Sequence, residues 1–233
     1  MCGIAGINFQ GTELVQRMNG AMNHRGPDYS DIFSDENVTL GHTLLAIRDE
    51  PKRSQQPVNE DEDPWVLSFN GQIYNTTELA RNLDGNWGNE SLDTTVLYAV
   101  IQKYGWDFIR HIQGMYALAV YNRHEKRLRL YRDASGQKPV YYYCNKAKLI
   151  FASEIKAILE DSSIQREPDQ EGIQWAARAG FIPSRHTMLE GINKLLPGEM
   201  LEWKHGRAGI RLTELDPELP YVESEEGFGG WMR

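Results

Sequence analysis

The second residue of the chain is a cysteine that could become the amino terminus. The sequence begins Met1-Cys2-Gly3, and a small second residue favours removal of an initiator methionine. A free α-amine and a thiol both titrate a little above neutral pH, so a terminal Cys2 would hold a nucleophile and its general base in one residue. The alternative interpretation is a plain cysteine buried at the start of a strand.

The Asn70-Gly71 pair is a second candidate for chemistry. An asparagine NH₂ group and the following backbone N–H are neutral donors that could stabilise the oxyanion formed when a thiol attacks an amide. The same pair is also the strongest short-range signal for a hairpin turn, and taken alone it favours the turn. Both interpretations are open at this point.

His24 and the acidic run at 60–63 are weaker candidates. A histidine can activate a thiol, but a terminal amine would already supply the base, and a loop histidine is more often structural. Four consecutive carboxylates without a neighbouring His or Cys indicate a solvated loop rather than a metal site. We therefore expect neither a metal nor a cofactor.

Short strands and amphipathic helices must position these residues. Apolar runs predict strands at 3–9, 38–47, 65–69, 115–121, 128–131, 140–143, 149–152 and 200–203. The run at 115–121 has no polar alternation, which is typical of a strand covered on both faces. The polar segment 122–126 then predicts a hairpin connection to the next strand.

Helical spacing of apolar residues is clearest between Ser91, as N-cap, and Tyr104, with Gly105 as the stop signal. Further helices are predicted at about 13–23, 153–159 and 169–180, with irregular chain from there to about 196. The tail from Thr213 to Arg233 is rich in Pro, Gly and Glu and indicates a linker or arm. The chain is therefore mixed α and β.

Composition limits the class of protein. With 233 residues, 40% apolar and 25% charged, the chain fits one globular domain. The net charge of −8 argues against a nucleic-acid partner. Two cysteines are too few for a disulfide framework, so a reducing cytoplasm is expected. No membrane association is expected either, because no apolar run approaches about 18 residues and the start lacks a secretory signal.

Eight strings occur in a fixed order along the chain: MCGIAGI, HRGPD at 24–28, SFNGQIYN at 68–75, LD at 92–93, QGMYALAVYN at 113–122, YRDASGQKPVYYY at 131–143, FASEIKAIL at 151–159 and LPGEML at 196–201. In this order they closely resemble the class II glutamine amidotransferases of the N-terminal nucleophile hydrolase superfamily, in the form of the amino-terminal domain of asparagine synthetase. The resemblance covers residues 2–203. It implies an α+β fold, namely a four-layer αββα sandwich of two antiparallel sheets.

The resemblance also implies roles for individual residues. Cys2 would form a thioester with the glutamyl group while its own amine shuttles protons, and Asn70 with Gly71 would surround the oxyanion. Arg25 would help to hold the wall of the active site, and Asp93 would contact the α-amino group of glutamine. An alternative for Asp93 is a favourable place in the first turn of a helix, which stabilises by only about 0.3 to 1 kcal/mol.

Two residues depart from the family pattern. Leu44 stands where the family has an arginine that pairs with the α-carboxylate of glutamine, and Gln72 stands where a glutamate is usual. Arg48 has the same strand parity as Leu44 but lies about 13 Å away along an extended strand. The loss of a bidentate arginine should weaken or redirect recognition of free glutamine.

No pyrophosphate loop of a synthetase domain is visible, so residues 204–233 are interpreted as a carboxy-terminal arm or linker. The leading hypothesis is a glutamine amidotransferase domain that supplies ammonia to a separate synthetase partner, with the acidic arm as a candidate docking segment. Two alternatives remain: an impaired binding or regulatory module that keeps the fold, and a hydrolase of a related amide without a free carboxylate.

Overall fold

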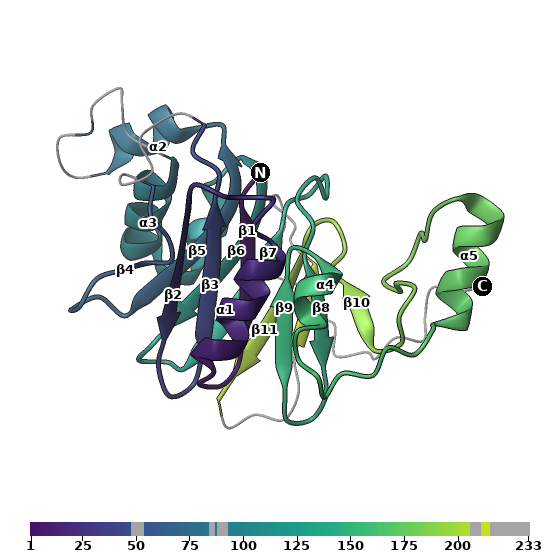
Figure 1. Cartoon of the computed structure of the whole chain (residues 1–233). Coiled ribbons are helices and arrows are strands. Elements are labelled where there is room, and N and C mark those ends of the chain that lie inside the picture. The colour runs from purple at the N-terminus through teal and green to yellow at the C-terminus, as the bar shows by residue number, and fades with distance from the viewer. Residues whose placement is uncertain (48–53, 84–86, 88–92, 206–210, 215–233) are drawn as a thin grey trace.

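The computed structural model describes residues 1–47, 54–83, 87, 93–205 and 211–214. Within these residues the chain forms two antiparallel sheets, with strand orders β10-β8-β9-β1-β3-β2 and β12-β11-β7-β6-β5-β4 (Figure 1). The first sheet consists of β1 (Gly3–Ile7), β2 (Tyr29–Ser34), β3 (Thr39–Leu44), β8 (Tyr141–Cys144), β9 (Leu149–Ala152) and β10 (Ile192–Lys194). The second sheet consists of β4 (Val58–Asn59), β5 (Trp65–Ile73), β6 (Gly114–Asn122), β7 (Arg127–Arg132), β11 (Glu199–Lys204) and β12 (Arg211–Glu214).

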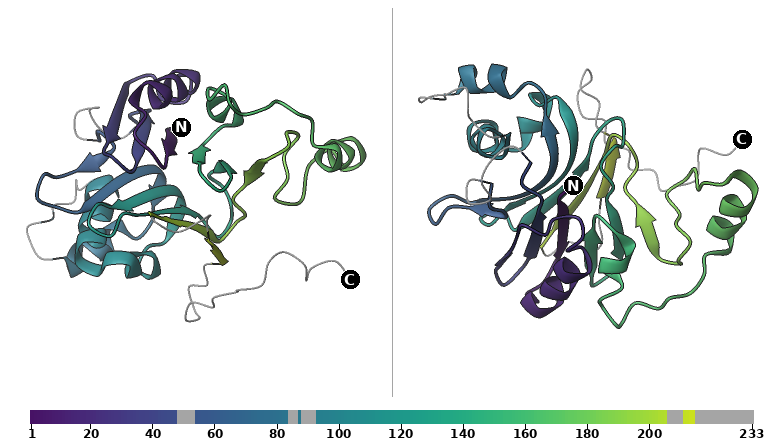
Figure 2. Two further views of the ribbon diagram at one scale, coloured as in Figure 1. Left: turned by 90° about the horizontal axis from the view of Figure 1, so that it is seen from below. Right: turned by 45° about the horizontal axis from the view of Figure 1, so that its top comes forward.

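Helices cover the outer faces of both sheets. The covering helices are α1 (Thr12–Ala21), α2 (Thr76–Asn82), α3 (Asp93–Tyr104), the 3₁₀ helix η2 (Gly105–Arg110) and α4 (Ile155–Ile158), and a further helix is α5 (Gln170–Ala179). Figure 2 shows α1 outside the first sheet and α2 with α3 outside the second. Helix α5 lies beside the sandwich, away from both sheets.

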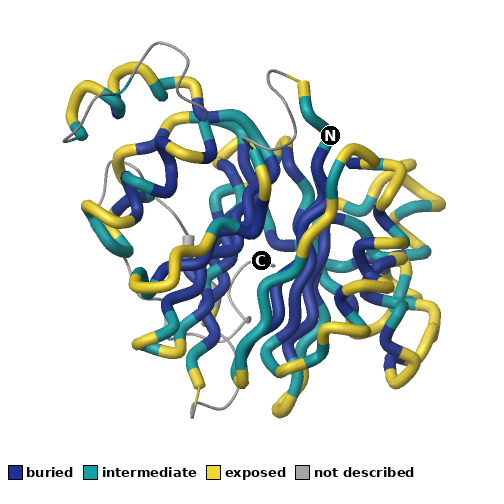
Figure 3. Tube along the Cα trace, turned by 60° about the vertical axis from the view of Figure 1, so that its left-hand side comes forward, coloured by how far each residue is buried: buried dark blue, intermediate teal, exposed yellow. Residues whose placement is uncertain are grey.

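Three hydrophobic clusters fill the spaces between the layers. Ile4, Phe151 and Leu201 belong to the cluster between the two sheets. A second cluster packs β5 and β6 against α3, and a third packs β1 and β9 against α1 and α4. The order of layers is therefore helix, sheet, sheet, helix, which confirms the predicted αββα sandwich. Figure 3 shows the buried segments concentrated in the strands and the exposed ones in the outer connections.

Strand β1 lies in the middle of the first sheet, paired with β3 on one side and β9 on the other. All five of its residues are buried. Ile4 packs between the sheets, whereas Ala5 and Ile7 pack toward the helices. A strand covered on both faces needs apolar or small residues throughout, which is why GIAGI shows no polar alternation.

Most predicted elements are present in the described residues. Strand β9 coincides with its prediction, and β6 and β7 are joined by the predicted polar hairpin. Helix α5 begins at an N-cap whose Asp169 side chain accepts a hydrogen bond from the Gly172 N–H, and it ends at Gly180 with φ of 74°. Helix α3 ends before Gly105, which has φ of 56°. The predicted N-cap Ser91 lies outside the described residues.

The sequence patterns missed six elements, namely β2, β4, α2, η2, β10 and β12. Strand β10 lies in a segment that was expected to be irregular, and it is three residues long. Strand β12 lies wholly within residues 204–233, the segment interpreted as an arm, and it extends the second sheet by pairing with β11. Strands β4 and β12 lie at the edges of the second sheet, where pairing on one side is enough to hold a short segment.

His42 connects the two sheets through the core. It lies in β3, is fully buried, and its Nε2 is 3.0 Å from the carbonyl oxygen of Phe69 in β5. Burial lowers the pKa of His42 to about 4, and the hydrogen bond with Phe69 offsets only part of that effect. The neutral imidazole is therefore the form that the folded protein accommodates.

We expect the stability of the fold to fall as the pH drops from 6.5 toward 4. The pKa of His42 is lowered in the folded state, so its contribution is fully present above 6.5 and is lost as the unfolded state takes up a proton. The expected loss in free energy of unfolding is up to about 3 kcal/mol by pH 4, measured by urea denaturation.

His42→Asn is the control for this pH dependence. The variant should be less stable at pH 7 but should lack the slope between pH 6.5 and 5. Carboxylates with lowered pKa values, such as Asp133 and Asp161, lose their contribution only as the pH falls through and below about 4, so they do not produce that slope. An unchanged slope in the variant would contradict the assignment to His42.

Candidate functional site

Cys2 lies directly before β1, near the amino terminus of the chain. Gly3 is paired with Thr43, so the next position of the register places Cys2 opposite Leu44. The Sγ atom is 3.8 Å from the carbonyl oxygen of Leu45. Because side chains alternate along a strand, Cys2 has the parity of Ile4, which packs between the sheets. The thiol is partly buried and belongs to the inter-sheet side.

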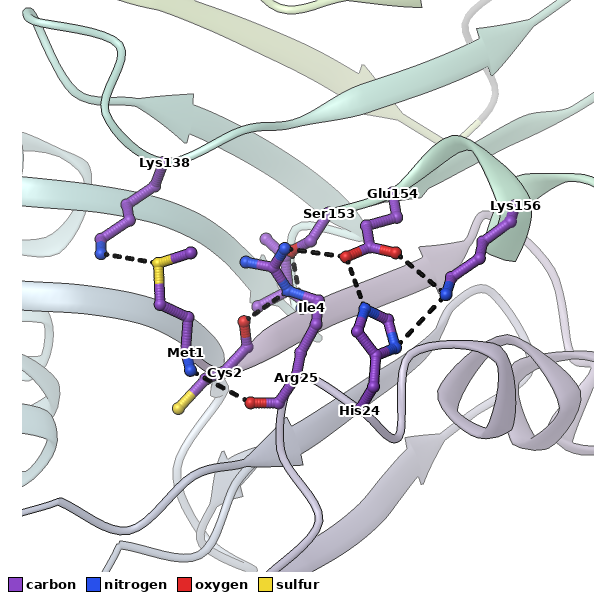
Figure 4. Close-up of polar contacts among 9 residues, drawn as sticks. All are labelled: Met1, Cys2, Ile4, His24, Arg25, Lys138, Ser153, Glu154 and Lys156. Carbon is purple, nitrogen blue, oxygen red and sulfur yellow. Dashed lines mark hydrogen bonds and ion pairs between the residues drawn. The ribbon is translucent and has the colours of Figure 1, made fainter.

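Met1 covers the amino group of Cys2 in this form of the chain. Its own amine donates a hydrogen bond to the Arg25 carbonyl oxygen at 3.1 Å, and its sulfur accepts one from Lys138 Nζ at 3.5 Å (Figure 4). The nitrogen of Cys2 is then an amide, which cannot take up a proton at neutral pH. The residue gains a base only when Met1 is removed.

Arg25 bonds the residue that carries the thiol. Its Nε donates to the Cys2 carbonyl oxygen at 3.0 Å, and its Nη1 donates to Glu154 Oε1 at 2.9 Å. The guanidinium side chain is only 9% exposed. Partial burial alone would raise the pKa of Glu154, but hydrogen bonds from Arg25 and His24 hold it below its ordinary value. The imidazole of His24 thus bonds Glu154 rather than the thiol.

The loop that carries Arg25 presses closely on β3. A Cβ atom on Gly26 would lie 2.4 Å from the carbonyl carbon of Thr43 and 2.6 Å from that of Leu44. Both are backbone atoms of a paired strand and cannot move aside cheaply. Only glycine therefore allows this loop to lie against the strand end beside Cys2.

Gly26→Ala should lower the free energy of unfolding by about 1–3 kcal/mol, because the new methyl group overpacks the loop against β3. Gly20→Ala is the matched control, since a Cβ at Gly20 in α1 meets no atom within 4 Å. That change should stabilise the fold by about 0.5–1 kcal/mol, because alanine is the better helix residue. Urea denaturation measures both, and equal effects would contradict the close approach at Gly26.

Asn70 and Gly71 lie within β5, paired with Ala117 and Tyr116 of β6. The hairpin-turn interpretation of this pair is therefore wrong. A Cβ on Gly71 would lie 2.1 Å from the Met115 carbonyl oxygen, so the close pairing of β5 with β6 requires glycine there.

The side chain of Asn70 is 2% exposed, and its Nδ2 has no hydrogen-bond acceptor in the described part of the chain. Two residues earlier on the same strand face, Ser68 Oγ donates to the Gly41 carbonyl oxygen of β3. Asn70 therefore faces the first sheet. A buried amide donor without an acceptor is unfavourable unless a ligand or water completes it.

Asp93 connects the end of β5 to α3. Its Oδ2 accepts a hydrogen bond from the Ile73 N–H at 3.0 Å, and its Oδ1 accepts one from Thr76 Oγ1 at 3.2 Å. Gln72 lies between these residues and Asn70, with a partly exposed side chain. Leu44 is 3% exposed, so the position where the family has an arginine holds a buried, uncharged side chain. Arg48 lies outside the described residues.

The predicted site residues thus form two groups. Cys2, Arg25 and Leu44 meet at the end of β1 and β3, whereas Asn70, Gly71, Gln72 and Asp93 lie along the end of β5. Strands β1 and β3 pack directly against β5 across the sandwich. The two groups therefore lie on strands that face each other across the sandwich. The Cys2 thiol and the unpaired Asn70 amide both lie on the side of their strand that faces the opposite sheet.

Sequence reasoning missed Glu154, Ser153 and Lys138 as neighbours of the amino terminus. Arg25 and Glu154 are 129 positions apart, and Lys138 and Met1 are 137 apart. These residues lie in the strings FASEIKAIL and YRDASGQKPVYYY, which belong to the family resemblance and could have indicated that they lie near the site. Neither string indicates by itself which side chain reaches Cys2.

The described ranges contain no group of three or more His, Cys, Asp or Glu side chains that could hold a metal ion. Asp63, from the acidic run, accepts hydrogen bonds from the Trp65 N–H and from Gln102 Nε2, both at 2.7 Å. Across these ranges, no helix is long and apolar enough to cross a membrane. Cys2 and Cys144 are both free thiols.

Solved structures place the fold in a known class. The glutamine phosphoribosylpyrophosphate amidotransferase from B. subtilis is 18% identical and superposes with a TM-score of 0.61, covering 91% of this chain and 49% of that one. The two-sheet sandwich of this chain is therefore the fold of that amidotransferase structure.

The chain belongs to the glutamine amidotransferase domain family, whose model matches residues 1–213, and it is a domain of the asparagine synthetase type. The putative asparagine synthetase 2 (glutamine-hydrolysing) of Methanocaldococcus jannaschii is 33% identical over 221 residues, which are 84% of this chain and 42% of that protein. The asparagine synthetase 1 of Bacillus subtilis is 34% identical over 208 residues, or 85% of this chain and 33% of that protein. The chain thus spans about a third to two fifths of the length of these relatives.

Proposed function

We propose that the chain releases ammonia from the side-chain amide of glutamine through a thioester on Cys2, after Met1 has been removed. The observation that supports this best is the buried NH₂ group of Asn70. This group has no acceptor in the described chain, and it faces the first sheet, whose strand β1 directly follows Cys2. An unpaired donor of this kind is preorganised for a charge that appears only during the reaction.

In the proposed reaction the free amine of Cys2 takes the thiol proton, and Sγ attacks the carboxamide carbon. The carbonyl oxygen becomes an oxyanion that accepts hydrogen bonds from Asn70 Nδ2 and the Gly71 N–H. The intermediate then collapses as the ammonium group of Cys2 returns a proton to the leaving nitrogen, which departs as ammonia. Water attacks the thioester, regenerates the thiol and releases glutamate.

The substrate end of the site is proposed to use Asp93 for the α-amino group, with Gln72 beside it on β5. Arg25 would hold the opposite wall through its bond to the Cys2 carbonyl oxygen. Because both Asp93 oxygens already accept hydrogen bonds from Ile73 and Thr76, its carboxylate is fixed in direction before a ligand binds. An ammonium group would add a further, charge-assisted donor to it.

The test is ammonia release from glutamine by the purified chain, after intact mass has shown that Met1 is absent. Release should disappear in Cys2→Ala, whereas Cys144→Ser should retain it, since Cys144 lies on β8 at the far side of β9. Release that is indifferent to Cys2→Ala would refute the proposal. No release from the processed protein would favour the regulatory module instead.

A second candidate substrate is a related amide without a free carboxylate. Leu44 favours it, because a buried apolar side chain occupies the register position opposite Cys2 where a carboxylate clamp would be needed. If this candidate is correct, a carboxylate-free amide such as butyramide should be turned over more efficiently than glutamine, and Leu44→Arg should reverse the preference. A preference for glutamine in the unmodified chain would exclude it.

The ammonia acceptor is proposed to be a synthetase active site, in a separate protein. Ammonia that is released without an acceptor nearby would be lost to solvent. An acceptor site that takes up the ammonia directly would use the product of the reaction. A reducing compartment such as the cytoplasm would suit the site, because oxidation of the thiol would stop the reaction. Copurification of a synthetase subunit, followed by glutamine-dependent amide synthesis, tests this part.

A further inference from the structure

We propose that Glu154 is a positioning residue for the Cys2 nucleophile and that it acts through Arg25. The inference rests on the proposed function, because it concerns the geometry that the thiol and its amine need for attack. Glu154 lies at the corner between β9 and α4, outside β1, the strand that follows Cys2. The fold nevertheless brings it to within one side chain of the amino terminus (Figure 4).

A nucleophile at a chain terminus needs external supports. Once Met1 is gone, Cys2 is continuous with the backbone on one side only, and chain ends fray unless they are tied down. A displacement of about 1 Å can reduce the rate of a positioned reaction about 10²-fold. The contacts that hold residues 2–4 therefore bear directly on catalysis.

The corner between β9 and α4 holds the start of β1 through two hydrogen bonds. Ser153 Oγ accepts a hydrogen bond from the Ile4 N–H at 3.0 Å, and the Ser153 N–H donates to the Ile4 carbonyl oxygen at 2.9 Å. Two residues closer to the terminus, Arg25 Nε donates to the Cys2 carbonyl oxygen. None of these bonds uses an atom of Met1, so its removal deletes none of their donors or acceptors.

Glu154 keeps Arg25 in this position. The guanidinium is almost completely buried, and the structure gives it one carboxylate partner in the described residues, Glu154 Oε1 at 2.9 Å. Without that carboxylate a buried positive charge would be left uncompensated, and Arg25 would turn toward water and release the Cys2 carbonyl oxygen. The bond to Cys2 therefore depends on a residue that does not touch Cys2.

Two further groups fix the carboxylate itself. His24 Nε2 lies 3.0 Å from Glu154 Oε1, and Lys156 Nζ lies 3.4 Å from Oε2. Figure 4 shows both side chains joined to Glu154 and neither of them joined to Cys2. Glu154 is thus held between two exposed cationic or polar side chains and one buried arginine, so its direction toward Arg25 is well defined.

The experiment compares Glu154→Ala with Glu160→Ala in the processed chain. Glu160 is the matched control, because it is 37% exposed and pairs with Arg17 at 3.8 Å on the same side of the sandwich. Glu154→Ala should lower kcat for ammonia release about 10²-fold while KM changes by less than about twofold, since the thiol is displaced and the substrate contacts remain. Glu160→Ala should leave both constants unchanged, and Glu154→Asp should recover part of kcat.

The double variant tests whether Glu154 acts through Arg25. In an Arg25→Ala background, Glu154→Ala should lower kcat by no more than about twofold, because the connection to Cys2 is already broken. Hydrogen exchange should increase at residues 2–5 in Glu154→Ala, with the rest of the core unchanged. A full additional loss in the double variant, a change in KM instead of kcat, or uniform loosening of the whole core would overturn the inference.

The two proposals fail in different ways. If the processed chain shows no Cys2-dependent ammonia release, the proposed function fails. Positioning is then judged by hydrogen exchange and by the alkylation rate of Cys2, read by mass spectrometry at that residue. Release that vanishes in Cys2→Ala but is unaffected by Glu154→Ala leaves the function standing and refutes the role of Glu154.

Discussion

A chain that keeps a residue in front of Cys2 should release no ammonia from glutamine above the level of Cys2→Ala. With Met1 in place the nitrogen of Cys2 belongs to a peptide bond, and the methionine amine is bound to the Arg25 carbonyl oxygen instead. The thiol then has no base within its own residue. General-base catalysis contributes about 10²- to 10⁴-fold, so the loss should be at least of that size.

Inserting a lysine between Met1 and Cys2 produces this form, because a large second residue blocks removal of the initiator methionine. Intact mass should show that Met1 is retained, and kcat for ammonia release should fall to background. Iodoacetamide labelling of Cys2 is the control, since it shows that the thiol itself is still accessible. Activity within about tenfold of the processed chain would mean that another group acts as the base, and the proposed mechanism would then be wrong.

The interior strands could be predicted from the sequence because burial on both faces leaves a simple signal. β1 and β6 are continuous apolar runs, and helix α5 has both of its terminal signals in Asp169 and Gly180. β2 was missed because YSDIFS is partly exposed along its length and has no clear period. α2 was missed because one residue of its seven, Leu79, is buried. Weakly buried elements depend on neighbours that a local pattern does not contain.

The Asn70-Gly71 pair shows how tertiary context can override a local preference. Its turn propensity is strong, but the residues on either side continue a strand that pairs with β6 over nine positions. The many hydrogen bonds of that ladder outweigh a preference of one dipeptide. The resemblance to a known family, rather than local propensity, was what indicated an active-site role for the pair.

The substrate end of the site was only partly predictable. Leu44 and Gln72 were noticed as departures because a pattern was available for comparison, and β3 then placed Leu44 opposite Cys2. Glu154 does not depart from the family pattern in this way, because its role depends on contacts with Arg25 and His24, which are distant in sequence. Positioning residues are generally of this kind, since their role is set by geometry rather than by residue type.

Asn70→Ala should lower kcat for ammonia release by about 10²- to 10³-fold with little change in KM, which corresponds to a loss of about 2.7–4 kcal/mol of transition-state stabilisation. The Nδ2 group is buried and has no acceptor among the described residues, so it is free to bond a developing oxyanion. In the ground state the carbonyl oxygen is a weaker acceptor, and the effect should therefore appear in kcat.

Ser68→Ala separates this role from a structural one. Ser68 lies on the same face of β5, is buried, and donates to the Gly41 carbonyl oxygen at 3.2 Å, so its hydrogen bond is already satisfied within the fold. Its removal should lower the free energy of unfolding by about 1–2 kcal/mol and leave kcat within about threefold. Asn70→Ala should give the opposite pattern, because it removes a donor that the resting fold does not use. Similar losses of kcat in both variants would mean that Asn70 supports the strand, and the oxyanion would then need a different donor.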